Sequence, residues 1–299
     1  METLTDNALS ITVNNFTLRA KTWGNDNGKN RILAIHGWLD NANSFNKIAP
    51  SLSKGHYIVA IDLAGHGLSD HRDANSSYYI WDYAIDILNC MDELKWKTCT
   101  LLAHSLGTGV ASIVAGAFPN RVDKLIFIDG IGPPFINQKD QIVHSFKSAH
   151  QQFKMAKKTS LYGFSNSDYP SFNTKEDAIK SRMLNRISPI SHEAASLLTN
   201  RGLKTVTKGY RWRHDPKIVL PECYKMTEDQ VLQFIKSITC KALIVLGKQG
   251  LFATGLYNSR LDAFRNAKIY WVEGNHHLHL ENEPKPITKL IHQFLQNTN

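Results

Sequence analysis

The chain contains 299 residues, of which 42% are apolar and 20% are charged. This length fits one large α/β domain, or a core with an insertion, and it can bury a sizeable core without disulfides. Because 10% of the residues are aromatic, with only 18 glycines and 10 prolines, the composition excludes an intrinsically disordered protein. The apolar runs also fall short of the ~20 residues that a membrane-spanning helix needs.

The N-terminus and the cysteines indicate the compartment. Residues 1–6 include acidic side chains where a secretory signal would have basic ones, so we expect no signal peptide. The cysteines form neither Cys-x-x-Cys pairs nor zinc-finger spacings. We predict four free thiols of a reducing, cytoplasmic protein: Cys90, Cys99, Cys223 and Cys240.

The net charge of +9 is concentrated in one block. Residues 131–240 hold 17 basic and 9 acidic side chains, which accounts for +8 of this excess. The block is either a solvated helical face or a surface that attracts anionic substrates. Nucleic-acid binding is not predicted, because the basic residues are dispersed and no recognised binding motif accompanies them.

The hydrophobic pattern predicts an α/β fold. Two alternating runs, 9–13 and 16–21, flank Asn14-Asn15 and predict an antiparallel hairpin. Six short apolar runs are typical of buried parallel strands: 32–35, 57–61, 100–103, 125–128, 242–246 and 269–272. Helical patterns cover three segments: 79–94, 106–118 and 286–295. This alternation predicts a mostly parallel central sheet with helices on both faces.

The segment between the fourth and fifth of these strands has a different pattern. It lacks strand-like runs, is rich in Lys, Ser and Asn, and shows helical periodicity at 142–156 and 178–187. We predict a helical cap over residues 133–238, inserted into a core that comprises residues 1–132 and 239–299.

Ser105 lies in the sequence Ala103-His104-Ser105-Leu106-Gly107, after a strand and before a helix. This context is typical of a nucleophile elbow, in which a serine is exposed on a tight strand-to-helix turn. The first amides of the helix would then face a developing oxyanion. The alternative is that Ser105 only caps the helix; the context favours the nucleophile.

Two further turns follow predicted strands. In His36-Gly37-Trp38, the Trp38 N–H could be a second oxyanion donor beside that of Leu106. The alternative for this turn is an ordinary strand end with a buried histidine. Asp62 begins a glycine-containing loop, where we expect it to accept hydrogen bonds from loop N–H groups and to take no part in proton transfer.

The general base is expected in Gly274-Asn-His-His-Leu-His-Leu-Glu281, directly after the last predicted strand. A histidine there can reach Ser105, and both His276 and His277 are candidates. A zinc site formed with His279 is a weaker alternative, since the loop lacks cysteines and a matching carboxylate pattern.

Together these motifs resemble the α/β-hydrolase fold family. The matching sequences are His36-Gly-Trp, Asp62-Leu-Ala-Gly-His-Gly-Leu-Ser69, His104-Ser-Leu-Gly107 and His276-x-x-His279-Leu-Glu281. Residues 37–45 and 275–279 look most similar to the serine hydrolase-like proteins of this family. The resemblance implies an α/β-hydrolase fold without metal or organic cofactor, with His276 as the base and His277 as a packing or loop residue.

The acid departs from the family pattern. The resemblance implies an Asp in a Gly-x-x-Asp turn after the penultimate strand, but this sequence has Gly247-Lys-Gln-Gly250. Some members, haloalkane dehalogenases among them, place the acid after the sixth strand, where this chain has Asp129. A triad requires its acid only in space. The alternative is that Asp129 merely bonds the turn at 130–132.

The sequence thus predicts a serine hydrolase, specifically a carboxylesterase acting on a small-molecule ester through an acyl-enzyme. Ser105 is the nucleophile, His276 the base and Asp129 the acid, with Trp38 and Leu106 as oxyanion donors. Serine as nucleophile argues against dehalogenase or epoxide hydrolase chemistry. Amides, thioesters and C–C bonds beside a ketone stay open as substrates. The alternative function is a ligand-binding protein or sensor with little turnover, because position 250 lacks a carboxylate.

Overall fold

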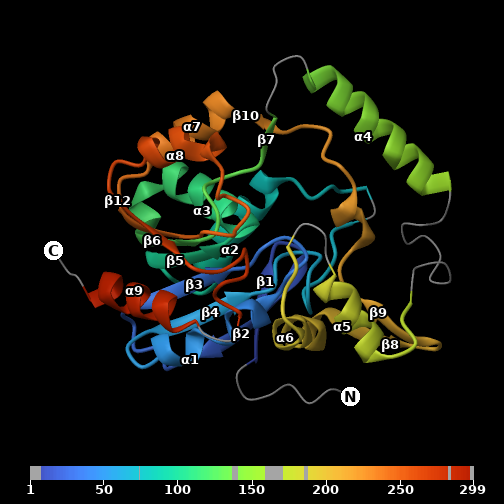
Figure 1. Cartoon of the computed structure of the whole chain (residues 1–299), viewed down its shortest axis with the longest axis horizontal. Helices are drawn as coiled ribbons and strands as arrows, with labels where there is room; N and C mark the ends of the chain where they lie inside the picture. The colour runs from blue at the N-terminus through green and yellow to red at the C-terminus, as the bar shows by residue number, and fades with distance from the viewer. Residues whose placement is uncertain are drawn as a thin grey trace.

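The computed structural model describes residues 8–73, 75–136, 141–158, 171–184, 188–281 and 284–296. An eight-stranded sheet forms its centre, in the order β1-β2-β4-β3-β5-β6-β11-β12 (Figure 1). The strands are β1 Ala8–Val13, β2 Phe16–Trp23, β3 Arg31–Ile35, β4 Tyr57–Ile61, β5 Cys99–His104, β6 Val122–Ile128, β11 Lys241–Gly247 and β12 Ala267–Val272. Only the β1–β2 and β2–β4 pairings in this sheet are antiparallel. The predicted hairpin and all six predicted parallel strands are confirmed. The expected burial is wrong for β12, because this strand lies at the edge of the sheet and exposes Ile269, Tyr270 and Trp271.

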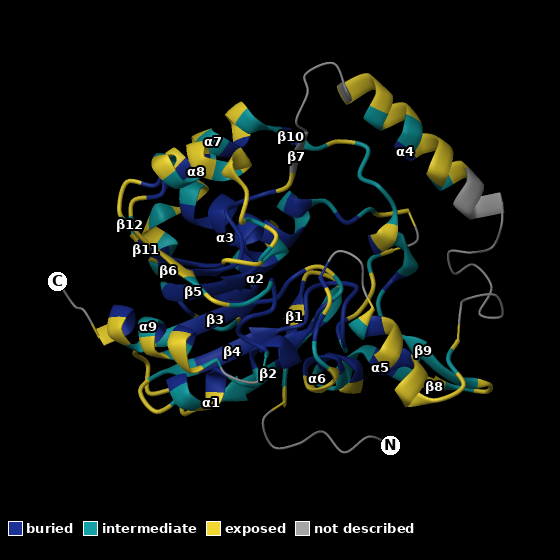
Figure 2. Cartoon of the chain, in the orientation of Figure 1, coloured by how far each residue is buried: buried dark blue, intermediate teal, exposed yellow. Residues whose placement is uncertain are grey.

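Helices cover both faces of the sheet, and two separate clusters of buried side chains fill the space between the layers. Alternate residues of β3 belong to different clusters: Leu33 packs toward α2 and α3, whereas Ile32 packs toward α1 and α9. The helices of these layers are α1 Ala49–Leu52, α2 Ile80–Glu93, α3 Leu106–Ala117, α7 Glu228–Ser237, α8 Asn258–Ala263 and α9 Lys285–Gln296. Burial on both faces explains the continuous apolar runs of the central strands (Figure 2).

The chain between β6 and β11 forms a long excursion from the sheet. It contains β7 Phe135–Ile136, α4 Gln141–Lys158, α5 Lys175–Met183, α6 His192–Gly202, β8 Leu203–Val206, β9 Gly209–Trp212, β10 Met226–Thr227 and then α7. Single turns of 3-10 helix complete the structure: η1 Ala42–Phe45, η2 Pro119–Arg121, η3 Pro216–Val219 and η4 Gly255–Tyr257. The two helices predicted here correspond to α4 and α5, although residues 185–187 of the second lie outside the described residues.

The β8–β9 hairpin contradicts the expectation that this excursion lacks strands. Each of its strands has four residues and carries charged side chains such as Lys204 and Arg211, so no apolar run marks it. Gly209 follows the turn with φ of 99°, a conformation that glycine adopts without strain.

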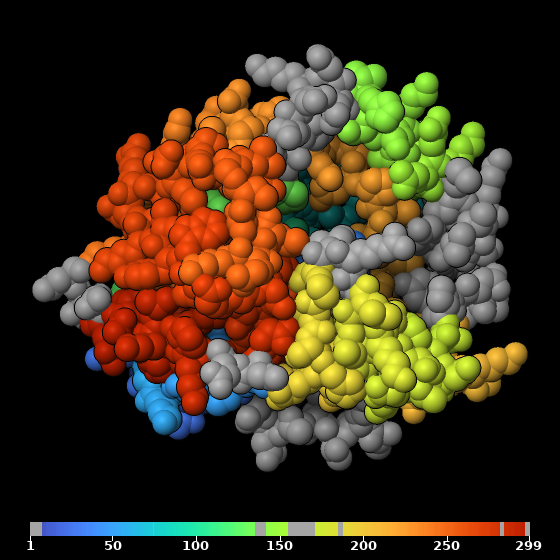
Figure 3. Space-filling view, viewed as in Figure 1, coloured from blue at the N-terminus to red at the C-terminus, as the bar shows by residue number. Residues whose placement is uncertain are grey.

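The two sides of the excursion differ in their attachment to the core. On one side, α6 is joined to η1: the Asn41 side-chain amide donates to the Leu198 carbonyl at 2.8 Å, and Arg201 pairs with the buried Asp62. Asp62 also accepts from loop N–H groups, as predicted. On the other side, α4 stands apart from the sheet (Figure 1) and leaves Val143 79% exposed. The space-filling view shows a hollow between α4 and the core (Figure 3). Throughout the described residues, every helix is too short or too polar to cross a membrane.

Candidate active site

Ser105 occupies the turn between β5 and α3, as the sequence predicts. Its backbone has φ of 50° and ψ of −117°, which is a strained conformation for a residue with a side chain. The turn also requires glycine at position 107, because an added Cβ there would lie 2.9 Å from the His36 carbonyl oxygen. The strained turn directs the Ser105 hydroxyl toward the loop that follows β12.

Ser105, His276 and Asp129 lie in one hydrogen-bonded line. The Nε2 atom of His276 is 2.8 Å from Ser105 Oγ, and Nδ1 of the same ring is 2.5 Å from Asp129 Oδ2. Because a carboxylate accepts hydrogen bonds, Nδ1 carries the ring proton, and Nε2 is left to accept from the serine hydroxyl. Three side chains that the sequence places in separate motifs are therefore adjacent, in the order that proton transfer from the serine needs.

Asp129 follows β6 and is fully buried. Its Oδ1 accepts from the Gly247 N–H at 2.9 Å, and its Oδ2 accepts from the Leu251 N–H at 3.1 Å. These bonds reach the turn after β11, where the family pattern would place an acid. A Cβ added to Gly250 would overlap Oδ1 of Asp129 and lie 2.6 Å from its Oδ2. The carboxylate of Asp129 therefore fills the space in which a side chain at position 250 would begin.

The surroundings of His276 keep its ring neutral. Burial lowers the pKa of His276 to about 4; the hydrogen bond to Asp129 opposes this shift, while the rings of His104 and His277 add to it. A neutral imidazole at physiological pH can accept a proton from Ser105, as a general base must.

Trp38 and Leu106 both line the cavity that contains Ser105. Leu106 is the first residue of α3, and the first N–H groups of a helix have no acceptor within it. Trp38 follows Gly37, whose added Cβ would lie 3.1 Å from the Cβ of Ser105, so this turn closely approaches the serine. Both residues therefore lie beside Ser105 at the same cavity.

The cavity at Ser105 has a volume of about 510 Å³. Its walls come from the core and from the excursion: Tyr78, Tyr83, Phe252 and Tyr257 on one hand, and Phe153 with residues 217–223 on the other. Sequence reasoning missed the 217–223 wall. Its contacts with the core span long sequence distances, as in the bond from Trp38 Nε1 to the Ile218 carbonyl at 3.2 Å, and local patterns carry no signal of them.

The histidines of the loop after β12 have separate partners. His277 Nδ1 lies 2.8 Å from Ser188 Oγ, and His279 Nε2 lies 2.9 Å from Ser44 Oγ, whereas His276 contacts Ser105. Their nitrogens do not converge on one point, so this geometry does not fit the zinc alternative.

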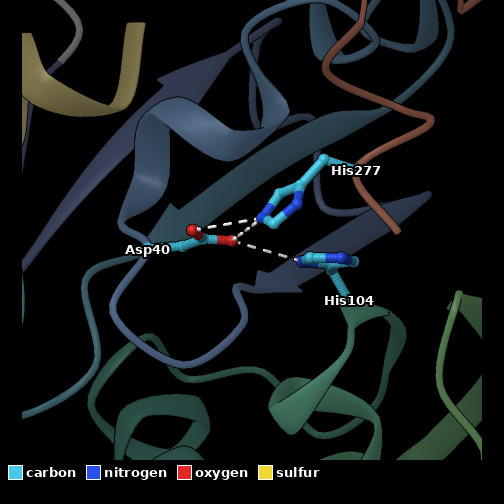
Figure 4. Close-up of side chains that lie close together, drawn as sticks. All are labelled: Asp40, His104 and His277. Atoms are coloured by element: carbon cyan, nitrogen blue, oxygen red, sulfur yellow. Dashed lines mark hydrogen bonds and ion pairs between the residues drawn. The ribbon is translucent and has the colours of Figure 1, made fainter. Parts of the chain in front are cut away.

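Another group has the spacing of a metal site. Asp40, His104 and His277 place ligand-type atoms within 4.8 Å of one another (Figure 4). However, Nη2 of Arg182 lies 2.6 Å from Asp40 Oδ1, so a cation would face a fixed positive charge. The donors and acceptors fit a network of ion pairs and hydrogen bonds better than a metal centre. Asp40 and His104 were not identified from the sequence as site residues.

Comparison with known proteins places this geometry in a family. Residues 30–214 match the family model described as alpha/beta hydrolase fold. The chain is 36% identical over 279 residues to a serine hydrolase-like protein of Dictyostelium discoideum, covering 89% of this chain and 75% of that protein. It is 32% identical over 296 residues to a probable serine hydrolase of Drosophila melanogaster, covering 96% and 87%.

A solved structure of a hypothetical protein from Pseudomonas aeruginosa PAO1 is similar throughout. It has a TM-score of 0.88 and 34% sequence identity, and the match covers 96% of this chain and 99% of that one. The fold and the resemblance inferred from the sequence are confirmed. The chain belongs to the alpha/beta hydrolase fold family and is related within it to the serine hydrolase-like proteins.

Proposed function

We propose that this protein is a serine hydrolase that cleaves carboxylic esters through an acyl-enzyme. The observation that carries the proposal is the hydrogen-bonded line from Ser105 through His276 to Asp129, at the wall of a cavity. A neutral base, an oriented hydroxyl and a buried carboxylate are the three groups that nucleophilic acyl transfer requires.

In the proposed reaction, Ser105 Oγ attacks the acyl carbon while His276 Nε2 takes its proton. Asp129 holds the ring and stabilises the imidazolium, and the Trp38 and Leu106 N–H groups bind the oxyanion. His276 then gives the proton to the departing alcohol, which leaves an acyl group on Ser105. A water molecule, deprotonated by His276, attacks this acyl group, and the acid is released as Ser105 regains its proton.

The alternative of a binding protein or sensor depended on the missing carboxylate at position 250. The overlap between the Asp129 carboxylate and a Cβ at that position supports the hydrolase instead, because the acid can be supplied from a neighbouring strand. We further propose that residues 133–238 act as the cap that selects substrates, since Phe153 and residues 217–223 line the cavity.

A series of p-nitrophenyl esters from acetate to laurate tests the proposed function. We expect hydrolysis of at least one member by the wild-type chain and none above background by Ser105→Ala. Ser112→Ala is the matched control, because Ser112 is a buried serine in α3 whose hydroxyl donates to the Thr108 carbonyl. Equal turnover by Ser105→Ala and the wild type would contradict the proposal.

A further inference from the structure

Asp40, His104 and His277 form a buried cluster beside the Ser105 turn, outside the reacting atoms of the proposed mechanism (Figure 4). They come from the turn after β3, the end of β5 and the loop after β12, and their exposed fractions are 2%, 0% and 3%. Burial of ionisable groups costs free energy unless they are paired. The pairing within this cluster connects it to the proposed base.

His104 joins the nucleophile turn to the loop of the base. Its Nε2 lies 3.0 Å from the main-chain oxygen of His276. A carbonyl oxygen only accepts hydrogen bonds, so Nε2 of His104 is the donor. Since His104 directly precedes Ser105, one side chain fixes the distance between the strand of the nucleophile and the main chain of the base.

Asp40 contacts the other nitrogen of the His104 ring. Its Oδ2 lies 3.3 Å from His104 Nδ1, and its Oδ1 accepts from Arg182 at 2.6 Å. Burial alone would raise the pKa of Asp40, but His277, His104 and Arg182 hold it well below its usual range. Asp40 is therefore a carboxylate, and its Oδ2 faces Nδ1 of the His104 ring. Glycine at position 37 permits this approach, because an added Cβ would lie 2.9 Å from Nδ1.

We propose that Asp40 and His104 form a second carboxylate–imidazole pair that positions His276 for proton transfer. This inference rests on the proposed function of Ser105 and His276. Asp40 orients the ring of His104, and this ring fixes the main chain from which the His276 side chain extends. His104 and Asp40 do not touch the reacting atoms, so they are positioning residues.

The His104 ring also acts electrostatically on the base. The ring centroids of His104 and His276 are 4.7 Å apart. Besides burial, which has the largest effect, the rings of His104 and His277 lower the pKa of His276, while Asp129 raises it. The ionisable groups around these two rings are His36 and Asp40 after β3, Asp129 after β6, Arg182 in α5, and His277 and His279 after β12. Removal of the His104 ring should therefore raise the pKa of His276.

Two substitutions separate positioning from a purely structural role. His104→Leu removes the hydrogen bond to the His276 main chain and the contact with Asp40. We expect kcat to fall on the order of a hundredfold with unchanged KM, since small misplacement of a base is costly. His104→Gln keeps an N–H near the position of Nε2 but removes the ring. We expect it to recover most of kcat, while the acidic limb of the kcat/KM profile moves to higher pH by on the order of one unit.

His66→Gln is the matched control, because His66 is buried and its Nδ1 lies 3.2 Å from the Ala64 carbonyl oxygen. It should change neither kcat nor the acidic limb. Thermal unfolding and active-site titration with a fluorophosphonate give the folded, reactive fraction of each variant. If His104→Leu does not fold, the pH profile of His104→Gln decides the question.

An unchanged kcat in the His104 variants, together with an unshifted acidic limb, would overturn the positioning role. In that case turnover would still disappear in Ser105→Ala. Turnover that survives Ser105→Ala would instead overturn the proposed function, so the two failures are distinguishable.

Discussion

The turns at the carboxyl edge of the sheet and the excursion between β6 and β11 are held by different means. Ser105, Asp129 and His276 each contact a neighbouring turn through hydrogen bonds of fixed geometry. Ser105 and Asp129 follow β5 and β6, which are buried on both faces, whereas His276 follows the edge strand β12. The excursion is attached by side-chain contacts at α6, while α4 exposes apolar residues such as Val143. The comparison teaches that the edge of the sheet positions the proposed reacting groups, whereas the excursion adds one wall of the cavity through Phe153 and residues 217–223.

The largest effect on turnover is expected from substitutions in the turns at the edge of the sheet. Ser105→Ala should lower kcat on the order of a millionfold, because members of such a triad act as a unit. His276→Ala should do nearly the same. Stopped-assay ester hydrolysis with purified variants measures both losses. Retention of a tenth of the activity by Ser105→Ala would contradict the mechanism.

His277→Ala should cost far less turnover than His276→Ala. His277 contacts Asp40 and Ser188 and not Ser105, so its removal affects packing more than proton transfer. Parallel kinetics of the two variants provide the measurement. A larger loss in His277→Ala would mean that the base has been assigned one residue too early.

Asp129→Asn should lower kcat on the order of ten thousandfold, because the amide keeps the shape but removes the charge and can reverse the ring tautomer. The fold should survive, which circular dichroism can establish. Near-normal turnover would remove Asp129 from the triad.

An exchange of positions sharpens this test. The double variant Asp129→Gly with Gly250→Asp moves the carboxylate to the turn after β11 and vacates the space that it must enter. Residue 129 has φ of 38°, which suits glycine, and Gly250 lies outside the left-handed region, so both backbones accept the change. We expect partial recovery of kcat relative to Asp129→Gly alone. Equal activity of the single and double variants would show that a carboxylate at 250 cannot replace Asp129.

The pH profile tests the environment of the base. Burial lowers the pKa of His276 to about 4, and only the neutral ring can accept the serine proton. The value of kcat/KM should therefore stay level from neutral pH down to about 5 and fall as pH drops through about 4. Assays at constant ionic strength locate this limb. A decline that begins near the ordinary histidine value of about 6.5 would contradict the account.

The smallest effect concerns the excursion and its charge. Lys217 and Lys225 line the cavity within the block that carries the basic excess. If this charge attracts anionic substrates, kcat/KM for a carboxylate-bearing ester should fall by roughly threefold when ionic strength rises tenfold. A neutral ester should not respond. Equal responses of the two esters would support a merely solvated face.

Features that depend on local sequence patterns could be predicted, whereas features that depend on contacts between distant parts of the chain could not. Buried parallel strands and the Ser105 turn carry local signals, and these predictions agree with the fold. The Asp40–His104 pair and the 217–223 wall carry none, because each depends on residues brought together from distant parts of the chain. Asp129 could be predicted in part. Its place directly after a strand is visible in the sequence, but the position of its carboxylate beside Gly250 depends on β6 and β11 being neighbours in the sheet.

Covalent capture of the nucleophile tests the central claim most directly. We expect a fluorophosphonate to form one phosphonyl adduct, which peptide mass spectrometry should locate on Ser105, and we expect His276→Ala to react far more slowly. Ser112→Ala should react as the wild type does. Absence of an adduct on folded wild-type protein, or an adduct on another serine, would contradict an activated Ser105 and with it the proposed hydrolase.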